Sequence, residues 1–169
     1  MKKTIYLVLT VLITLSCGND KKKEKQIEKT TPTKTEATTK KTEASTNEVT
    51  ILLSSNDQMQ YDKTELKVKA GQKVTLTLKH TGKMAKNVMG HNFVLLKQGT
   101  DIPTFAEKAL EVADKEYIPE GDKVIAHTKL IGGGESTTIT FNAPAKGTYD
   151  YLCTFPGHYA IMKGKFIVE

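Results

Sequence analysis

Short runs of alternating apolar and polar residues dominate the chain from Glu48 onward and decide its fold class. Between Val74 and Lys79 the alternation is strict, which is the period of a β-strand with one buried face. Turn signals such as Ala70-Gly71 and Thr81-Gly82 separate the runs. Further strand candidates are Val49–Leu53, Leu66–Lys69, Asn92–Leu96, Lys123–Thr128, Ser136–Phe141, Thr148–Cys153 and Lys165–Val168. Eight short strands at this spacing predict an all-β sandwich or barrel.

One stretch departs from strand periodicity. Thr104–Lys115 places four apolar residues at helical spacing, directly after Pro103, a residue favoured in the first turn of a helix; they are Phe105, Ala109, Leu110 and Val112. We expect a short helical flap outside the sandwich.

The N-terminus has the pattern of an export signal. Lys2 and Lys3 precede the apolar run Ile5–Leu15, which is too short to span a bilayer as a stable helix, and Cys17 follows. Residues 1–17 resemble a bacterial lipoprotein signal that leaves a lipidated Cys17 as the new N-terminus; a plain secretory signal with an incidental cysteine is the alternative. Both interpretations predict an exported protein, periplasmic or associated with the outer membrane.

Residues 18–47 are rich in Lys, Thr and Glu and nearly free of apolar side chains, so we expect a disordered tether. A flexible coil of about 30 residues has an average reach of roughly 30 Å. The tether holds 8 Lys against 5 acids, whereas residues 48–169 hold 15 Lys and 14 acids, and the chain contains no Arg. The net charge of +6 therefore belongs mainly to the N-terminal part, which argues against nucleic-acid binding. We expect residues 48–169 to form one domain, and that domain to be monomeric.

Cys153, His158 and Met162 place a thiol, an imidazole and a thioether within ten residues. The Pro156-Gly157 turn between two predicted strands allows all three side chains to face one point, and His91, at the start of another strand, is the natural source of a second imidazole. A thiolate, two imidazoles and a weak axial thioether describe a blue-copper site. Taken singly, each residue is more often structural. The chain has no second Cys pair for a Cys-rich zinc site, and no arrangement that would activate Cys153 as a nucleophile.

The chain resembles the azurin family of bacterial blue-copper cupredoxins across nearly all of Glu48–Glu169. The resemblance is carried by four segments: Asn56–Gln60, Lys86–Asn92, Val124–Gly132 and Cys153–Gly164. It implies an eight-stranded Greek-key sandwich that carries single electrons on one copper ion. Matching motif positions imply that the strong ligands are His91, Cys153 and His158, that Met162 is the weak axial ligand, and that the Gly90 carbonyl approaches the metal from the opposite side.

The resemblance also implies supporting roles around the metal. Asn92 would brace the ligand loop beside the cysteine sulfur, and the amide of Phe155 would hydrogen-bond that sulfur. Thr154 is expected to be a further supporting residue next to the ligands. Tyr159 stands where the family usually has a small residue, beside a ligand His158 that we expect to be exposed, and could change the docking rim. His80 and His127 also match family positions, and we interpret both as structural or titrating residues rather than ligands.

Apolar residues around His158 predict a docking patch through which electrons enter or leave. Its expected members are Met59, Met84, Val88, Met89, Phe155, Pro156, Ala160 and Ile161. Expected partners are redox proteins such as c-type cytochromes, peroxidases or reductases, and the membrane that holds the lipid anchor. A copper storage or delivery protein is the alternative, although the tether lacks the Met- and His-rich motifs of that class. An enzyme would need a second metal site or a substrate pocket, for which the remaining histidines are too few and too scattered.

Overall fold

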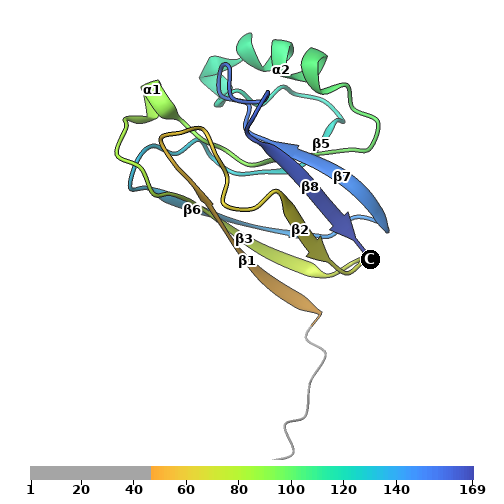
Figure 1. Ribbon diagram of the computed structural model, residues 1–169. Helices are drawn as coiled ribbons and strands as arrows, with labels where there is room; N and C mark the ends of the chain where they lie inside the picture. Colours follow the sequence, from red (N-terminus) through yellow and green to blue (C-terminus); the bar gives the residue numbers. More distant parts are fainter. Residues whose placement is uncertain (1–46) are drawn as a thin grey trace, which may run out of the picture. The chain divides into compact units, whose positions relative to one another are not determined.

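Two β-sheets form the body of the computed structural model, which describes residues 47–169 (Figure 1). One sheet has the strand order β1-β3-β6 and the other the order β2-β8-β7-β4-β5. The strands are β1 (Glu48–Ser55), β2 (Glu65–Val68), β3 (Lys73–His80), β4 (Val94–Leu96), β5 (Val124–His127), β6 (Ser136–Asn142), β7 (Gly147–Leu152) and β8 (Lys163–Val168). The all-β, eight-stranded sandwich predicted from the sequence is confirmed.

Alternation along β3 explains how the two sheets meet. Val74, Leu76 and Leu78 are fully buried in a core to which both sheets contribute. On the opposite face of the same strand, the hydroxyl of Thr77 lies 2.8 Å from that of Thr138 on β6. Because successive side chains point to opposite faces of a strand, one face of the sheet is buried and the other faces solvent.

Two strand pairs are parallel, and each joins segments separated in sequence. β1 pairs with β3, and β2 pairs with β8 in the register Glu65↔Lys165. β8 also pairs antiparallel with β7, so it lies in the interior of its sheet. The strand that follows the segment Cys153–Met162 is therefore held on both edges.

The insert between β4 and β5 contains α2 (Ile102–Leu110) and the 3-10 turn η1 (Ala113–Lys115). Asp101 caps α2 by accepting a hydrogen bond from the amide of Thr104 at 3.0 Å. Beneath α2 lies a second apolar cluster of four buried residues, which are Val94, Leu96, Phe105 and Leu152. Tyr159 is half-buried against this cluster, so it packs toward the helical insert and does not stand free on a docking rim.

The boundaries show where the sequence-based predictions differ from the structure. The helix ends at Leu110 instead of continuing to Lys115, because the chain turns into η1. A four-residue helix, α1 (Lys86–Met89), was not predicted. β7 ends at Leu152, so Cys153 directly follows the strand, and β4 begins at Val94, three residues after His91. The expected signal, the lipidated Cys17 and nearly all of the tether lie outside the described residues.

Within residues 47–169, no helix is long and apolar enough to cross a membrane.

Leu76 and Leu52 offer a matched test of this core, since they lie on adjacent strands and are 0% and 52% exposed. Leu76→Ala should lower the free energy of unfolding by about 2–5 kcal/mol, because it leaves a cavity between the sheets. Leu52→Ala should change it by less than about 0.5 kcal/mol. Urea unfolding of the metal-free protein measures both. Equal losses in the two variants would contradict this account of the core.

Candidate metal centre

Three buried side chains converge at one end of the sandwich. Cys153 Sγ lies 3.6 Å from His158 Nδ1 and 3.9 Å from His91 Nδ1. Among the residues that the structure describes, these three form a group whose donor atoms all lie within 4.8 Å of one another. One thiol and two imidazoles are soft donors that suit copper or zinc, and His91 joins the other two from a segment 62 residues away in sequence.

The loop between β7 and β8, Cys153–Met162, carries two of these donors and is called the ligand loop. Its ends are closed by the amide of Cys153, which donates to the carbonyl of Met162 at 2.9 Å. Inside the loop, the amide of His158 donates to Phe155 O and the amide of Met162 donates to His158 O, at 3.0 and 2.8 Å. Gly157 has a φ of +81°, a conformation that most side chains disfavour. The Pro156-Gly157 turn thus folds the loop back so that Cys153 and His158 meet.

His91 is oriented by the backbone of a distant loop. Its Nε2 lies 2.9 Å from the carbonyl oxygen of Asn56, which can only accept a hydrogen bond. Nε2 therefore carries the proton, and the lone pair of Nδ1 faces Cys153. The backbone of His91 is fixed as well, because it exchanges two hydrogen bonds with Ile131. This is the arrangement by which a protein sets the tautomer of a metal-binding imidazole.

Asn92 joins the segment that carries His91 to the loop that carries Cys153. Its amide nitrogen donates to Thr154 Oγ1 at 2.8 Å and to the carbonyl of Glu116 at 3.1 Å, and its amide oxygen accepts from Thr154 N at 2.9 Å. Asn92 is fully buried and Thr154 nearly so. The brace implied by the sequence resemblance thus exists as a set of hydrogen bonds, with an additional acceptor at Glu116.

Burial sets the ionisation of the donors in the metal-free protein. It raises the pKa of the Cys153 thiol to about 12, although the backbone amides of Asn92 and Phe155 favour the thiolate and oppose the shift. Burial also lowers the pKa of His91 and His158 to about 4. At neutral pH both imidazoles are therefore uncharged and ready to bind a cation, whereas the thiol must lose its proton when a metal binds.

His158 is less accessible than expected, with 3% of its surface exposed. Its ring lies 5.0 Å from that of His91 and 4.8 Å from that of Phe155, which in turn packs edge-on against Tyr117 at 5.4 Å. Tyr117 and its neighbour Glu116 both have left-handed backbones, with φ of 63° and 57°. This unusual pair positions the Tyr117 ring against Phe155 and the Glu116 carbonyl at Asn92.

Met162 and Gly90, which the resemblance assigns to the metal, are both buried. Met162 is fully buried in the main core at the end of the ligand loop. The carbonyl of Gly90 lies 3.8 Å from Cys153 Sγ. A Cβ at Gly90 would lie 2.5 Å from Lys86 O and 2.9 Å from a ring carbon of Phe155, so a larger residue would force the backbone away from this approach.

His80 packs behind the cluster without contributing a donor to it. Its ring stacks on that of His91 at 4.3 Å, and it is fully buried. Its Nδ1 accepts from the amide of Gly82 at 3.0 Å and its Nε2 lies 3.0 Å from Met89 O, so both ring nitrogens have partners.

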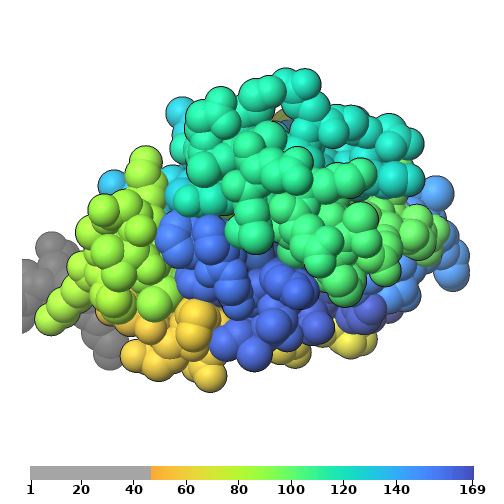
Figure 2. Space-filling model, turned by 90° about the horizontal axis from the view of Figure 1, so that it is seen from above, coloured from red at the N-terminus to blue at the C-terminus, as the bar shows by residue number. Residues whose placement is uncertain are grey.

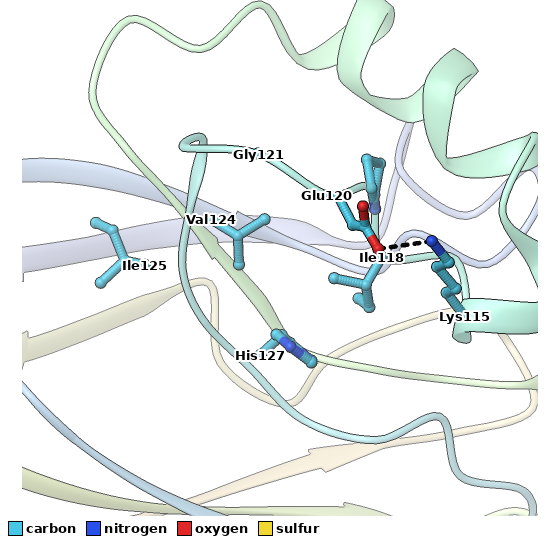
Figure 3. A pocket seen from close by; sticks show the side chains of 8 residues that line it. Lys115, Ile118, Glu120, Gly121, Val124, Ile125 and His127 are labelled. Atoms are coloured by element: carbon cyan, nitrogen blue, oxygen red, sulfur yellow. Dashed lines mark hydrogen bonds and ion pairs between the residues drawn. The ribbon is translucent and has the colours of Figure 1, made fainter.

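His127 lies on β5 beside a pocket of about 400 Å³, away from the donor cluster (Figure 3). An ion pair of 2.6 Å between Lys115 and Glu120 closes one side of this pocket. The complete lining is Lys115, Ile118, Pro119, Glu120, Gly121, Val124, Ile125 and His127, and it includes none of the three donors.

The predicted docking patch is partly exposed. Met84, Val88 and Ile161 are 37%, 53% and 60% exposed, and Pro156 and Ala160 are exposed as well. Met59 and Met89 are half-buried, whereas Phe155 is 8% exposed and forms part of the core instead of the surface. The exposed apolar residues thus come from α1, the segment before it, and the ligand loop.

Sequence reasoning missed several groups that support the centre. The Asn56 carbonyl is a backbone atom and has no side-chain signal, although the polar interruption after β1 marks a turn there. The Asn56 side chain shapes that turn by accepting from the amides of Gln58 and Gln60, at 3.0 and 3.2 Å. Glu116 and Tyr117 lie in the helical insert, where nothing in the residue pattern connects them with the metal site.

Asn92→Ala tests whether the hydrogen-bonded brace stabilises the centre. The substitution leaves up to three partner atoms unsatisfied, of which the two on Thr154 are buried, and a buried unsatisfied atom costs about 1–3 kcal/mol. We expect the free energy of unfolding of the metal-free protein to fall by about 2 kcal/mol or more. Asn142→Ala, at an exposed position of β6, is the matched control and should change it by less than about 0.5 kcal/mol. Comparable losses in the two variants would rule out a special role for Asn92.

Comparisons with known proteins agree with this geometry. Residues 47–169 match the family described as copper binding proteins, plastocyanin/azurin family. Azurin-1 of Alcaligenes xylosoxydans xylosoxydans is 46% identical over 122 residues, which cover 69% of this chain and 95% of that protein. Outer membrane protein H.8 of Neisseria gonorrhoeae is 47% identical over 116 residues, or 66% of this chain and 62% of that protein. Among solved structures, auracyanin A, a "blue" copper protein from Chloroflexus aurantiacus, superposes with a TM-score of 0.67 at 38% identity, covering 72% of this chain and 99% of its own. The chain therefore belongs to the plastocyanin/azurin family of copper-binding proteins.

Proposed function

We propose that this chain is a single-electron carrier whose type 1 copper ion would be held by His91, Cys153 and His158, with Met162 and the Gly90 carbonyl as weaker ligands. The observation that carries the proposal is the convergence of one thiol and two Nδ1 atoms in a buried site. Bound copper would supply a couple that changes oxidation state by one electron.

The contribution of the protein is to hold the donors still and to exclude water. His91 is fixed through Asn56 and Ile131, and the ligand loop through Asn92 and its internal hydrogen bonds. Donors that are fixed before the metal binds cannot rearrange freely when its charge changes, which favours fast electron exchange. The apolar residues around the loop would give a partner a dry contact area close to His158.

Burial also favours electron transfer over copper storage or delivery. The three donors are between 0% and 3% exposed. An electron can cross a thin layer of protein, whereas an ion can leave only if the layer opens. Storage and delivery require repeated ion exchange and would be better served by accessible donors.

We further propose that the protein works outside the cytoplasm, tethered through lipid on Cys17. The basic and apolar pattern of residues 1–17 supports export. A relative of similar sequence is named an outer membrane protein, which fits a tethered carrier. The partners would be redox proteins such as c-type cytochromes, peroxidases or reductases.

Copper(II) addition to the full-length protein tests the function. We expect a strong visible band from charge transfer between the thiolate and copper, and its complete loss in Cys153→Ser. Cys17→Ser is the matched control, because it removes the other cysteine of the chain and should keep the band. A protein that binds copper tightly without colour would contradict the proposal and favour storage.

Lipidation of Cys17 predicts a change of location. The wild-type protein expressed in a bacterium that processes lipoproteins should fractionate with membranes, whereas Cys17→Ser should not carry lipid and should leave the membrane fraction. Immunoblotting of the fractions, with the visible band as a measure of folding, checks this. Equal distribution of the two proteins would support the plain secretory signal instead.

A further inference from the structure

Two lysines lie among apolar residues on the segment Gly82–Met89, which includes α1. Lys83, Met84, Lys86 and Val88 are all exposed. Figure 2 shows this segment, in yellow-green, directly beside the blue loop that carries Cys153 and His158. The apolar contact area near the metal centre therefore has a basic edge on this side.

The two lysine charges are not paired within the described part of the chain. Neither Lys83 nor Lys86 forms an ion pair with any of residues 47–169. The carboxylate of Asp57 accepts hydrogen bonds from the backbone amides of Lys83 and Met84, at 2.8 and 3.2 Å. Glu135, which also lies beside this segment, accepts from the amide of Gly132 at 2.8 Å. Both carboxylates thus hold the backbone, and the ammonium groups remain available to another molecule.

The segment is fixed in place, so its charges occupy a defined position. A Cβ at Gly132 would lie 2.7 Å from Lys86 N, and a Cβ at Gly133 would lie 2.5 Å from the carbonyl carbon of Lys83. These close approaches pack the backbone of both lysines against the Gly132–Gly134 turn. A docking partner would need to order the lysine side chains but not the loop.

The opposite side of the ligand loop has the opposite charge. Residues 101–122, which include α2, contain seven Asp or Glu and two Lys. Glu120 pairs with Lys115, and Asp122 pairs with Lys97 and Lys123, so five of these acids remain outside ion pairs with residues 47–169. Figure 2 shows this insert, in green to teal, across the blue ligand loop from α1. The surface around the ligand loop is therefore positive on the α1 side and negative on the α2 side. A partner with the complementary charge distribution would dock preferentially in one orientation.

We infer that the protein that exchanges electrons at this face docks with an acidic edge over Lys83 and Lys86 and an apolar centre over Met84, Val88 and Ile161. The inference rests on the proposed function and adds the charge and orientation of the partner. Carboxylates facing the two lysines would raise the association rate more than the lifetime of the complex, which suits rapid turnover.

A double charge reversal with a matched control tests the inference. Lys83→Glu/Lys86→Glu changes the charge beside the centre. Lys69→Glu/Lys146→Glu changes the net charge by the same amount at the other end of the sandwich, where Ala70 and Gly71 bond the backbone of Glu169 and Ala143. Stopped-flow spectroscopy would follow electron transfer from the copper(I)-loaded full chain to two probes, an acidic bacterial c-type cytochrome and the basic mitochondrial cytochrome c. An ionic strength of about 0.1 M sets the Debye length at about 10 Å and screens the distant control.

With Lys83→Glu/Lys86→Glu we expect the second-order rate constant to fall about tenfold with the acidic cytochrome and to rise with the basic one. The control should change both rate constants by less than about twofold. Lys83→Gln/Lys86→Gln should give intermediate values, because it removes charge without reversing it. High salt should bring all variants together.

Equal rate changes in the two double variants, with the visible copper band intact, would overturn this inference and leave the proposed function standing. Unchanged rates combined with lost binding to vesicles of anionic lipid would also overturn it, and would assign the lysines to a membrane surface. Absence of the copper band in the wild-type protein would instead overturn the proposed function.

Discussion

The structure depends on keeping a thiol and two imidazoles out of water without leaving their polar atoms unsatisfied. Burial disfavours the charged forms of these groups, so it raises the pKa of Cys153 and lowers the pKa values of His91 and His158. Their buried polar atoms would also cost free energy without hydrogen-bond partners. The chain solves this by bringing polar partners to the same end of the sandwich from separate segments. Among residues 47–169, no buried side-chain nitrogen or oxygen lacks a hydrogen-bond partner. The sheets act as a frame for these contacts.

The need for hydrogen-bond partners at a buried site explains why sheets and loops have different roles here. Strands supply long-range order, since β4 and β7 bring the segments of His91 and Cys153 side by side. Loops supply the polar atoms, because a backbone carbonyl such as that of Asn56 can accept a hydrogen bond from a side chain where it is not already paired between strands. A metal centre at the end of a β-sandwich can therefore be rigid although most of its atoms belong to loops.

The sequence was informative wherever one residue pattern has one physical meaning. Short strand-like runs bounded by turn signals identified all eight strands, and the spacing of Cys153, His158 and Met162 identified a candidate metal site. It could not show that His158 is nearly buried or that Tyr159 packs under α2, because both depend on how the insert folds over the loop. It also missed α1, whose four residues are too few to display a helical period. Contacts made by backbone atoms, such as the Glu116 carbonyl with Asn92, leave no side-chain pattern to detect.

The parallel pairing of β2 with β8 has a consequence for the order of events during synthesis. Glu65 pairs with Lys165, a hundred residues later, and β8 lies between β2 and β7 in the finished sheet. A ribosome-bound chain that has not yet released β8 therefore lacks an interior strand of its larger sheet. The larger sheet therefore cannot be completed until β8 is available, and pairing over so long a separation in sequence is slow.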